Sequence, residues 1–184
     1  MAGGGGNGGG GICAARHLAN RGVDVRLCLA DPGRLSPLPA FQRKIFASTP
    51  GKEIEIAQLE DSTLDVILDA LIGYGLRSAP VGPVARLIRW AERAGAPVLA
   101  LDMPSGVDST TGHAPGDFVR ARWTVTLALP KTGLAPDKAG EVILADVGIP
   151  EQTYRRAGVP YRTPFDARFL VPLIRGKPWT SGER

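Results

Sequence analysis

Cysteine, histidine, aromatic residues and long apolar runs are all scarce in this chain. Its 184 residues include 2 cysteines and 2 histidines, and aromatic residues make up 6%. Two cysteines without a second pair predict neither a disulfide framework nor a zinc site. No apolar run reaches the roughly 18 residues of a membrane helix, and the start MAGGGG lacks the regions of a signal peptide. We therefore expect no membrane contact, no export and a cytoplasmic location.

Charge of one sign is not concentrated anywhere either. Lys and Arg together number 22 against 18 Asp and Glu, which gives a net charge of +4 and an isoelectric point near 9.4. The basic residues are dispersed, and no basic stripe is interleaved with aromatic residues. This pattern does not favour nucleic acid as a partner. A phosphorylated small molecule suits the modest positive charge equally well.

Glycine, by contrast, is abundant, with 24 residues beside 16 prolines. Residues 3–11 read GGGGNGGGG, with Asn7 as the one side chain in the run. Where no Cβ is present, backbone N–H groups face a ligand, and a following helix N-terminus adds positive partial charge. The run therefore predicts a phosphate-binding turn. The strand that should feed such a turn is missing ahead of it.

Helical and strand-like patterns alternate along the rest of the chain. This alternation predicts an α/β fold with a right-handed, mainly parallel sheet. We expect a single domain over residues 1–174 and a tail over residues 175–184. The predicted helices cover residues 12–20, 39–48, 84–94 and 151–156, and the predicted strands cover residues 23–29, 54–57, 64–68, 98–101, 123–129 and 141–147.

Aspartates follow two of the apolar strands at their carboxyl ends, where ligands collect in open α/β sheets. They are Asp69 and Asp102, and a turn-forming or helix-capping role is the alternative for each one taken alone. Asp102 opens the segment DMPSGVD, whose carboxylate, hydroxyl and carbonyl oxygens form a set suited to a hard cation. A second loop, GYGLRS at residues 73–78, brings Arg77 as a partner for phosphate, with an ordinary surface loop as the alternative.

Five motifs, in order between Gly3 and Pro150, resemble those of one family. GGGGNGGGGICAARHL is similar to the GxGNNGGDGxxAARHL turn of the NAD(P)H-hydrate epimerases, also called the YjeF N-terminal domain. LDALIGYGL resembles that family's DALFGTGL, and LDMPSGVDSTTG resembles its DIPSGVDADTG. TVTLALPKTGL resembles TVTFxxPKxGL, and EVILADVGIP resembles the closing DIGIP. The DMPSGVD segment is the most specific of the five.

The resemblance implies a Rossmann-like, three-layer α/β/α fold with a mainly parallel sheet whose first strand is missing. It implies an enzyme that interconverts the R and S epimers of hydrated NADH and NADPH, with Asp102 as the acid/base, because epimerisation needs a proton donor and acceptor. Lys131 of the PKTG motif is interpreted as structural. The implied potassium ligands are Asn7, Asp69 and Ser105, and the implied substrate contacts are Gly6, Asn7, Gly8, Gly9, Gly10, Gly73, Tyr74, Gly75, Leu76, Arg77, Ser78, Ala79 and Asp102.

Two positions depart from the family pattern. The family's first asparagine is Gly6 here, and its aspartate is Gly10. Each lost hydrogen-bonding side chain is expected to weaken binding by about 1–3 kcal/mol. These replacements favour a rival hypothesis, a non-catalytic dinucleotide-binding or protein-interaction module. A second rival is an NAD-dependent oxidoreductase, for which Asp31 lies near the expected acidic position after the turn.

The resemblance also bears on partners. The small-molecule partner is hydrated NADH or NADPH, and the expected cofactor is a potassium ion. A homodimer and a functional partnership with NAD(P)H-hydrate dehydratase, fused or separate, are the macromolecular partners that this resemblance allows.

Overall fold

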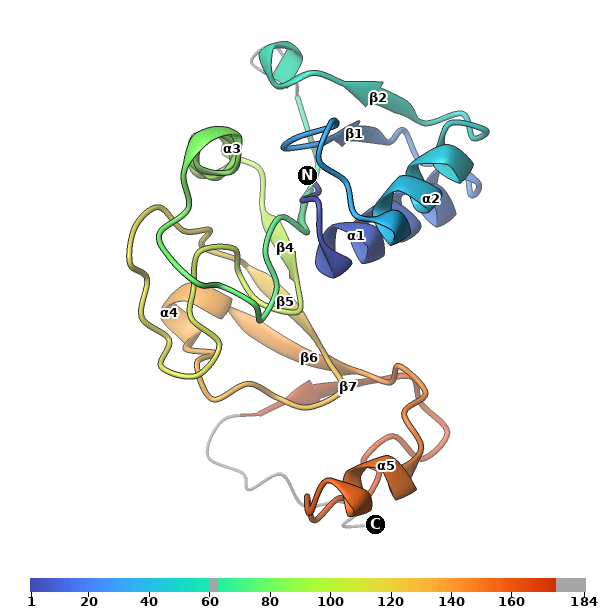
Figure 1. Ribbon diagram of the computed structural model, residues 1–184, viewed down its shortest axis with the longest axis vertical. Helices are drawn as coiled ribbons and strands as arrows, with labels where there is room; N and C mark the ends of the chain where they lie inside the picture. Colours follow the sequence, from blue (N-terminus) through green and yellow to red (C-terminus); the bar gives the residue numbers. More distant parts are fainter. Residues whose placement is uncertain (60–62, 175–184) are drawn as a thin grey trace.

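The computed structural model describes residues 1–59 and 63–174 and has one parallel and one mainly parallel sheet, flanked by helices (Figure 1). The smaller sheet pairs β2 with β1, and the larger one has the order β3-β4-β5-β6-β7. The strands of the two sheets are β1 Arg26–Cys28, β2 Lys52–Ile54, β3 Ile67–Asp69, β4 Val98–Leu101, β5 Trp123–Leu127, β6 Glu141–Ala145 and β7 Leu170–Leu173. The helices are α1 Gly6–Ala19, α2 Pro37–Phe46, α3 Gly82–Arg93, α4 Pro136–Ala139 and α5 Glu151–Arg156, with a 3₁₀ helix, η1, at Ile56–Leu59.

The first residues of the chain join the two sheets. Ala2 forms parallel bridges with Leu29 on one side and with Ala70 on the other. Its N–H donates to Cys28 O at 2.9 Å and its carbonyl accepts from Ala30 N at 3.0 Å. Among the described residues no regular strand precedes the glycine run. Ala2 nevertheless lies in the place of such a strand and makes the sheet continuous across it.

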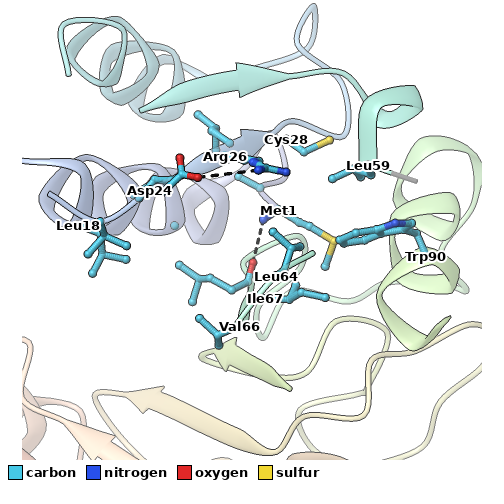
Figure 2. A pocket seen from close by; sticks show the side chains of 17 residues that line it. Met1, Leu18, Asp24, Arg26, Cys28, Leu59, Leu64, Val66, Ile67 and Trp90 are labelled. Carbon is cyan, nitrogen blue, oxygen red and sulfur yellow. Dashed lines mark hydrogen bonds and ion pairs between the residues drawn. The ribbon is translucent and has the colours of Figure 1, made fainter. Parts of the chain in front are cut away.

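Two apolar clusters cover opposite faces of this sheet, which confirms the predicted three-layer arrangement. Residues alternate between them along β1, since Leu27 packs toward α1 and α2 whereas Cys28 packs toward α3. Ala2 belongs to the cluster of α1, and Met1 packs against the cluster of α3 (Figure 2). Alternation of this kind is what a parallel strand covered on both faces requires.

The predicted elements are found, and most of their bounds shift by a few residues; the strand predicted at 23–29, for example, covers only Arg26–Cys28. α1 begins at Gly6 rather than at residue 12, so six of the nine residues in the glycine run are helical. Glycine is a poor helix former, and the pattern of apolar residues therefore hides this part of the helix. The strand predicted at residues 54–57 lies at Lys52–Ile54, and the strand predicted at 64–68 lies at Ile67–Asp69.

The carboxyl-terminal region adds a strand that the sequence analysis does not predict. β7 pairs antiparallel with β6, and Pro172 lies opposite Ile143. A proline inside the run argues against a strand, but it is tolerated at a sheet edge, where one side of the backbone has no neighbour to bond. The predicted tail over residues 175–184 lies outside the described residues.

No helix within the described parts of the chain is both long and apolar enough to cross a membrane.

Candidate functional site

Asp69 and Ser105 form a closely bonded pair at the carboxyl edge of the sheet. Asp69 is the last residue of β3, Ser105 lies in the loop after β4, and both are fully buried. The Ser105 N–H donates to Asp69 Oδ2 at 2.8 Å, and the Ser105 hydroxyl donates to Oδ1 at 2.6 Å. Leu71 N–H also donates to Oδ1, at 3.2 Å. The DMPSGVD loop is thereby anchored to the neighbouring strand.

The environment of Asp69 opposes its ionisation. Burial raises the pKa of this carboxyl above its usual value, while the hydrogen bonds from Ser105 and Leu71 and the distant Met1 ammonium partly offset that effect. The direct donors to its oxygens are uncharged groups. A carboxylate in such a place is stabilised by any cation that comes close to it.

Asp102 is the second carboxylate at this edge, and its backbone is strained. It follows β4 directly, is 4% exposed and has a φ of 70°, in the left-handed region that few residues other than glycine adopt. Its Oδ2 accepts from Tyr74 N–H at 3.2 Å, and its Oδ1 accepts from Leu127 N–H at 3.3 Å. Strain of this kind concentrates at functional sites. It turns the Asp102 side chain toward two loops that carry family motifs.

Lys131 completes the surroundings of Asp102. Its ammonium forms an ion pair with Asp102 Oδ1, donates to Leu127 O at 2.7 Å and lies 3.3 Å from Thr126 Oγ1. The two side chains are 18% and 5% exposed, so the pair is largely shielded from water. Sequence reasoning leaves Lys131 as structural, whereas the structure places it on the proposed acid/base. The PKTG motif directly after a strand is the signal that could have found it.

Asn7 and Gly73 connect the glycine run to both carboxylates. Asn7 Nδ2 donates to Leu101 O at 3.2 Å, one residue before Asp102. A Cβ at Gly73 would lie 3.0 Å from Asn7 Cγ and 3.1 Å from Asp102 Oδ2, so a larger residue here would require these side chains to shift by a few tenths of an ångström. The preceding Ile72 N–H donates to Ser105 Oγ at 2.8 Å. The three implied potassium ligands and the implied acid/base thus surround one short stretch of loop.

The glycine run serves packing as much as ligand binding. A Cβ at Gly3 would lie 2.1 Å from Leu71 O, and one at Gly8 would lie 1.8 Å from Gly3 O. A Cβ at Gly4 or at Gly11 would likewise lie 2.3 Å from a neighbouring atom, so neither position has room for a side chain. Gly6 differs, because it is exposed and nothing lies within 4 Å of a Cβ built there. At Gly10 the nearest atom is Leu101 Cδ2, at 3.1 Å.

The predicted substrate turn at Gly6–Gly10 is therefore the first part of α1 rather than a turn ahead of a helix. Gly5 caps the helix, and its carbonyl accepts from Gly9 N–H at 3.0 Å. The amides of the first helical residues point away from the helix body without an intrahelical acceptor. This end of α1 retains the positive partial charge on which the phosphate prediction depends.

The loop of residues 73–79 is only partly joined to this cluster. Tyr74 contacts Asp102 through its backbone, while its side chain is 72% exposed. Gly75, Arg77 and Ser78 are also exposed, Leu76 is half-buried, and Ala79 lies against Gly116. The loop thus presents exposed side chains beside the buried carboxylates, and Arg77 is its one cationic group.

The oxygen donors at this edge suit a hard cation better than a soft transition metal. In the parts of the chain that the structure describes, no three His, Cys, Asp or Glu side chains gather as a metal site. Asp69, Ser105 and Asn7 offer carboxylate, hydroxyl and amide oxygens instead, which are hard ligands. A cation held there would favour the ionised form of the Asp69 carboxyl, which burial alone opposes. The structure brings Asp69 and Ser105 together, and Asn7 lies against Gly73, next to the Ile72 that contacts Ser105.

Asp31, the acidic residue considered for an oxidoreductase, has a local role. Its Oδ1 accepts from Gly33 N–H at 3.1 Å in the turn after β1. It is thus a turn-forming aspartate, and this contact leaves the oxidoreductase hypothesis without support from Asp31.

Comparison with known proteins gives the same assignment as the motifs. Residues 1–133 match the family described as YjeF-related protein N-terminus. An NAD(P)H-hydrate epimerase of Dehalogenimonas lykanthroporepellens is 48% identical over 94% of this chain and 71% of its own. The bifunctional NAD(P)H-hydrate repair enzyme Nnr of Moorella thermoacetica is 34% identical over 77% of this chain. Enhancer of mRNA-decapping protein 3 of Xenopus laevis is 30% identical over 88% of it.

The chain spans only 29% and 31% of the last two relatives, so it corresponds to one part of each. Among solved structures, the crystal structure of yeast ynu0, YNL200c, superposes with a TM-score of 0.78 at 18% identity, over 94% of this chain and 75% of that one. That likeness supports the fold. With the family match over residues 1–133 and the epimerase relative, the chain belongs to the YjeF N-terminal family of NAD(P)H-hydrate epimerases.

Proposed function

We propose that the Asp102–Lys131 pair is the acid/base centre of an NAD(P)H-hydrate epimerase that acts in the repair of nicotinamide cofactors. The observation that supports this proposal is the convergence of donors on a strained, buried carboxylate. Tyr74 N–H, Leu127 N–H and the Lys131 ammonium all bind Asp102, beside the N-terminus of α1. The relative that is 48% identical is itself an NAD(P)H-hydrate epimerase.

The reaction requires one proton to be given and one to be taken. The substrate carbon bears a hydroxyl group beside a ring nitrogen, and its inversion proceeds either by loss and return of water or by ring opening. In the first route the departing hydroxyl takes a proton and leaves as water, and the water that returns to the other face gives a proton back. Asp102 is the group that exchanges this proton, and Lys131 is a positioning residue that keeps the carboxyl oriented.

Substrate binding is assigned to the surrounding backbone. The free amides at the start of α1 hold the pyrophosphate, and Arg77 from the exposed loop reaches another part of the dinucleotide. Asn7, Asp69 and Ser105 would hold the potassium ion, which when bound offsets phosphate charge and organises oxygen atoms. A cytoplasmic location is part of the same proposal, and the free thiols of Cys13 and Cys28 support it.

Asp102→Asn is the variant that tests the assignment most directly. Asparagine tolerates the left-handed backbone and keeps the shape of the side chain, but it does not exchange a proton as a carboxyl does. We expect the rate of interconversion of the two NADPH-hydrate epimers, followed by chromatography, to fall by about 10²–10⁴-fold. Binding of the substrate should change little. An unchanged rate in Asp102→Asn would overturn the acid/base assignment.

A binding module without catalysis is the second candidate function. The observation that favours it is the lack of hydrogen-bonding side chains at Gly6 and Gly10, where the family pattern has asparagine and aspartate. It predicts binding of the hydrated cofactor without turnover, in potassium and in sodium alike. Calorimetric titration beside the chromatographic assay separates it from the epimerase.

A further inference from the structure

Tyr74 presents its ring to water at the edge of the Asp102 cluster. The residue is 72% exposed, whereas Asp102 is 4% exposed. Gly73 and Gly75 flank Tyr74 in the chain, so neither neighbour has a side chain that covers the ring. A single exposed aromatic residue is common on protein surfaces and indicates nothing by itself. What distinguishes Tyr74 is that its backbone is held on both sides.

Two hydrogen bonds fix the backbone of Tyr74, one on each side of its Cα. Its N–H donates to Asp102 Oδ2 at 3.2 Å, and its carbonyl accepts from the Ser109 hydroxyl at 3.1 Å. These partners lie 28 and 35 residues further along the chain, so both contacts are tertiary rather than local. The ring of Tyr74 therefore projects from an anchored Cα next to the proposed acid/base.

Ser109 is itself held in place by the turn that carries it. Gly133 N–H donates to Ser109 O at 2.9 Å. The preceding Asp108 closes the turn, because its Oδ1 accepts from Thr110 N–H at 3.0 Å and from Thr111 N–H at 2.7 Å. A short side chain on a fixed backbone loses little conformational entropy when it forms a hydrogen bond. Ser109 is therefore a suitable anchor for the Tyr74 loop.

Tyr74 and Ser109 are both departures from the motifs that the rest of their loops match. Tyr74 stands where DALFGTGL has threonine, and Ser109 stands where DIPSGVDADTG has alanine. Alanine has no hydroxyl to donate, so the bond between these two loops belongs to this chain and not to the motifs. The two departures meet at one hydrogen bond, which indicates that they act together.

The reacting ring of the substrate has to lie close to Tyr74 if Asp102 exchanges the proton. A general acid or base works at roughly 2.6–3.2 Å from the group that it serves. The described donors to Asp102 are Tyr74, Leu127 and Lys131, and Tyr74 is the aromatic one among them. The nicotinamide-derived ring is uncharged and partly planar, which suits it to packing against a tyrosine ring.

We propose that Tyr74 is a specificity-determining residue whose ring packs against the nicotinamide-derived ring of the hydrated cofactor, and that Ser109 is the positioning residue that holds Tyr74 for this contact. The inference rests on the proposed function, because it places the reacting ring at Asp102. It names the part of the substrate that the loop of residues 73–79 recognises besides phosphate.

Tyr74→Thr is the first test, because it removes the ring and leaves both backbone bonds available. We expect the Kd for hydrated NADPH, measured by calorimetric titration, to rise about tenfold. Hydrated, reduced nicotinamide mononucleotide lacks the adenosine half of the dinucleotide, and its Kd should rise by the same factor. Tyr74→Phe keeps the ring and should retain most of the affinity for both ligands. Phe169→Thr is the matched control, since Phe169 lies beside β7 and is 78% exposed.

The outcomes separate this inference from the proposed function. An unchanged Kd in Tyr74→Thr would overturn the inference, and so would a rise confined to the dinucleotide, which would assign the ring to adenine. Interconversion of the epimers is followed in the same samples. If the unsubstituted chain binds without interconverting them, the proposed function fails, while the Kd values still decide the role of Tyr74. Absence of binding to the unsubstituted chain would overturn both.

Ser109→Ala tests the positioning role through its dependence on the Tyr74 ring. We expect the Kd to rise about threefold in the unsubstituted background but not in the Tyr74→Thr background, where no ring remains to be positioned. Ser109→Thr keeps the hydroxyl and should restore the affinity. Thr49→Val is the control, because it removes a hydroxyl that donates to Phe46 O at 2.7 Å at the end of α2. Equal effects of Ser109→Ala in both backgrounds would overturn the positioning role.

Discussion

Ser105 binds both oxygens of Asp69, one through its backbone amide and the other through its hydroxyl. This double contact fixes the direction in which the DMPSGVD loop leaves β4. Because Asp102 and Ser105 belong to the same loop, the pair also sets where the Asp102 carboxyl lies. The buried carboxyl of Asp69, whose described donors are uncharged, thus helps to position the carboxyl of Asp102.

The first prediction concerns pH and Asp69. Burial raises its pKa in the folded protein, so between the unfolded value and this raised one the folded state binds more protons. The free energy of unfolding should therefore fall as pH rises through this window. Asp69→Asn should abolish this dependence of the free energy of unfolding on pH. It should also lower that free energy by about 1–3 kcal/mol, because the new amide NH₂ would face a donor group of Ser105. Urea denaturation at a series of pH values measures both, and an unaltered slope in the variant would contradict the prediction.

Potassium should stabilise the folded chain more than sodium does. A cation held by Asn7, Asp69 and Ser105 binds only the folded state, and it contributes about 1.4 kcal/mol at about ten times its Kd. The melting temperature in potassium chloride, compared with sodium chloride at equal ionic strength, is the measurement. Ser105→Ala should lose the difference. Equal melting temperatures in the two salts would count against a potassium site.

Lys131→Met should separate catalysis from binding. The methionine fills the volume of the lysine stem but leaves Asp102 without its cationic partner. We expect kcat to fall by on the order of 10²-fold with KM little changed. Lys138→Met is the matched control, because that ammonium pairs with Asp137 at 2.9 Å. If both lysine variants lose the same activity, Lys131 has no special role.

Alanine should act in opposite directions at two glycines of α1. Gly6→Ala adds a methyl group into open space and should raise the free energy of unfolding by about 0.5–1 kcal/mol. Gly8→Ala places a Cβ 1.8 Å from Gly3 O, a backbone atom, and should lower it by about 1–3 kcal/mol. Thermal denaturation of the two variants side by side provides the comparison, and effects of the same sign would refute the packing explanation.

Asparagine at position 6 should improve binding of the substrate. The site has room for the side chain, and asparagine is the residue of the family pattern there. One added hydrogen bond to the substrate should lower KM by about tenfold. Gly5→Asn, next to it and equally unobstructed, is the control. A KM unchanged in Gly6→Asn would show that position 6 does not face the substrate.

The sequence predicts the sheet and the two carboxylates well because their signals are local. Apolar strands such as residues 98–101 end at an aspartate, and that is visible without any partner. The start of α1 is not predicted, because glycine is a poor helix former and the close contacts that require it, such as that of Gly11 with Ala70, lie far along the chain. β7 is missed for a related reason, since Pro172 is acceptable only at an edge that the sequence does not reveal.

The role of Lys131 is missed because it depends on a turn. Lys131 reaches Asp102 only because the chain reverses after β5, where Ala128 has a φ of 64°. The sequence PKTG indicates a turn but not which side chain it returns to the sheet. Distances between motifs that are 29 residues apart follow from the fold alone.

The strained backbone of Asp102 sets two kinds of selection against each other. Glycine would relieve the left-handed conformation, but it would also leave the shielded Lys131 ammonium without its carboxylate. A screen of variants for heat resistance alone is therefore expected to replace Asp102 and Lys131 together rather than Asp102 by itself. A screen for turnover would retain both residues.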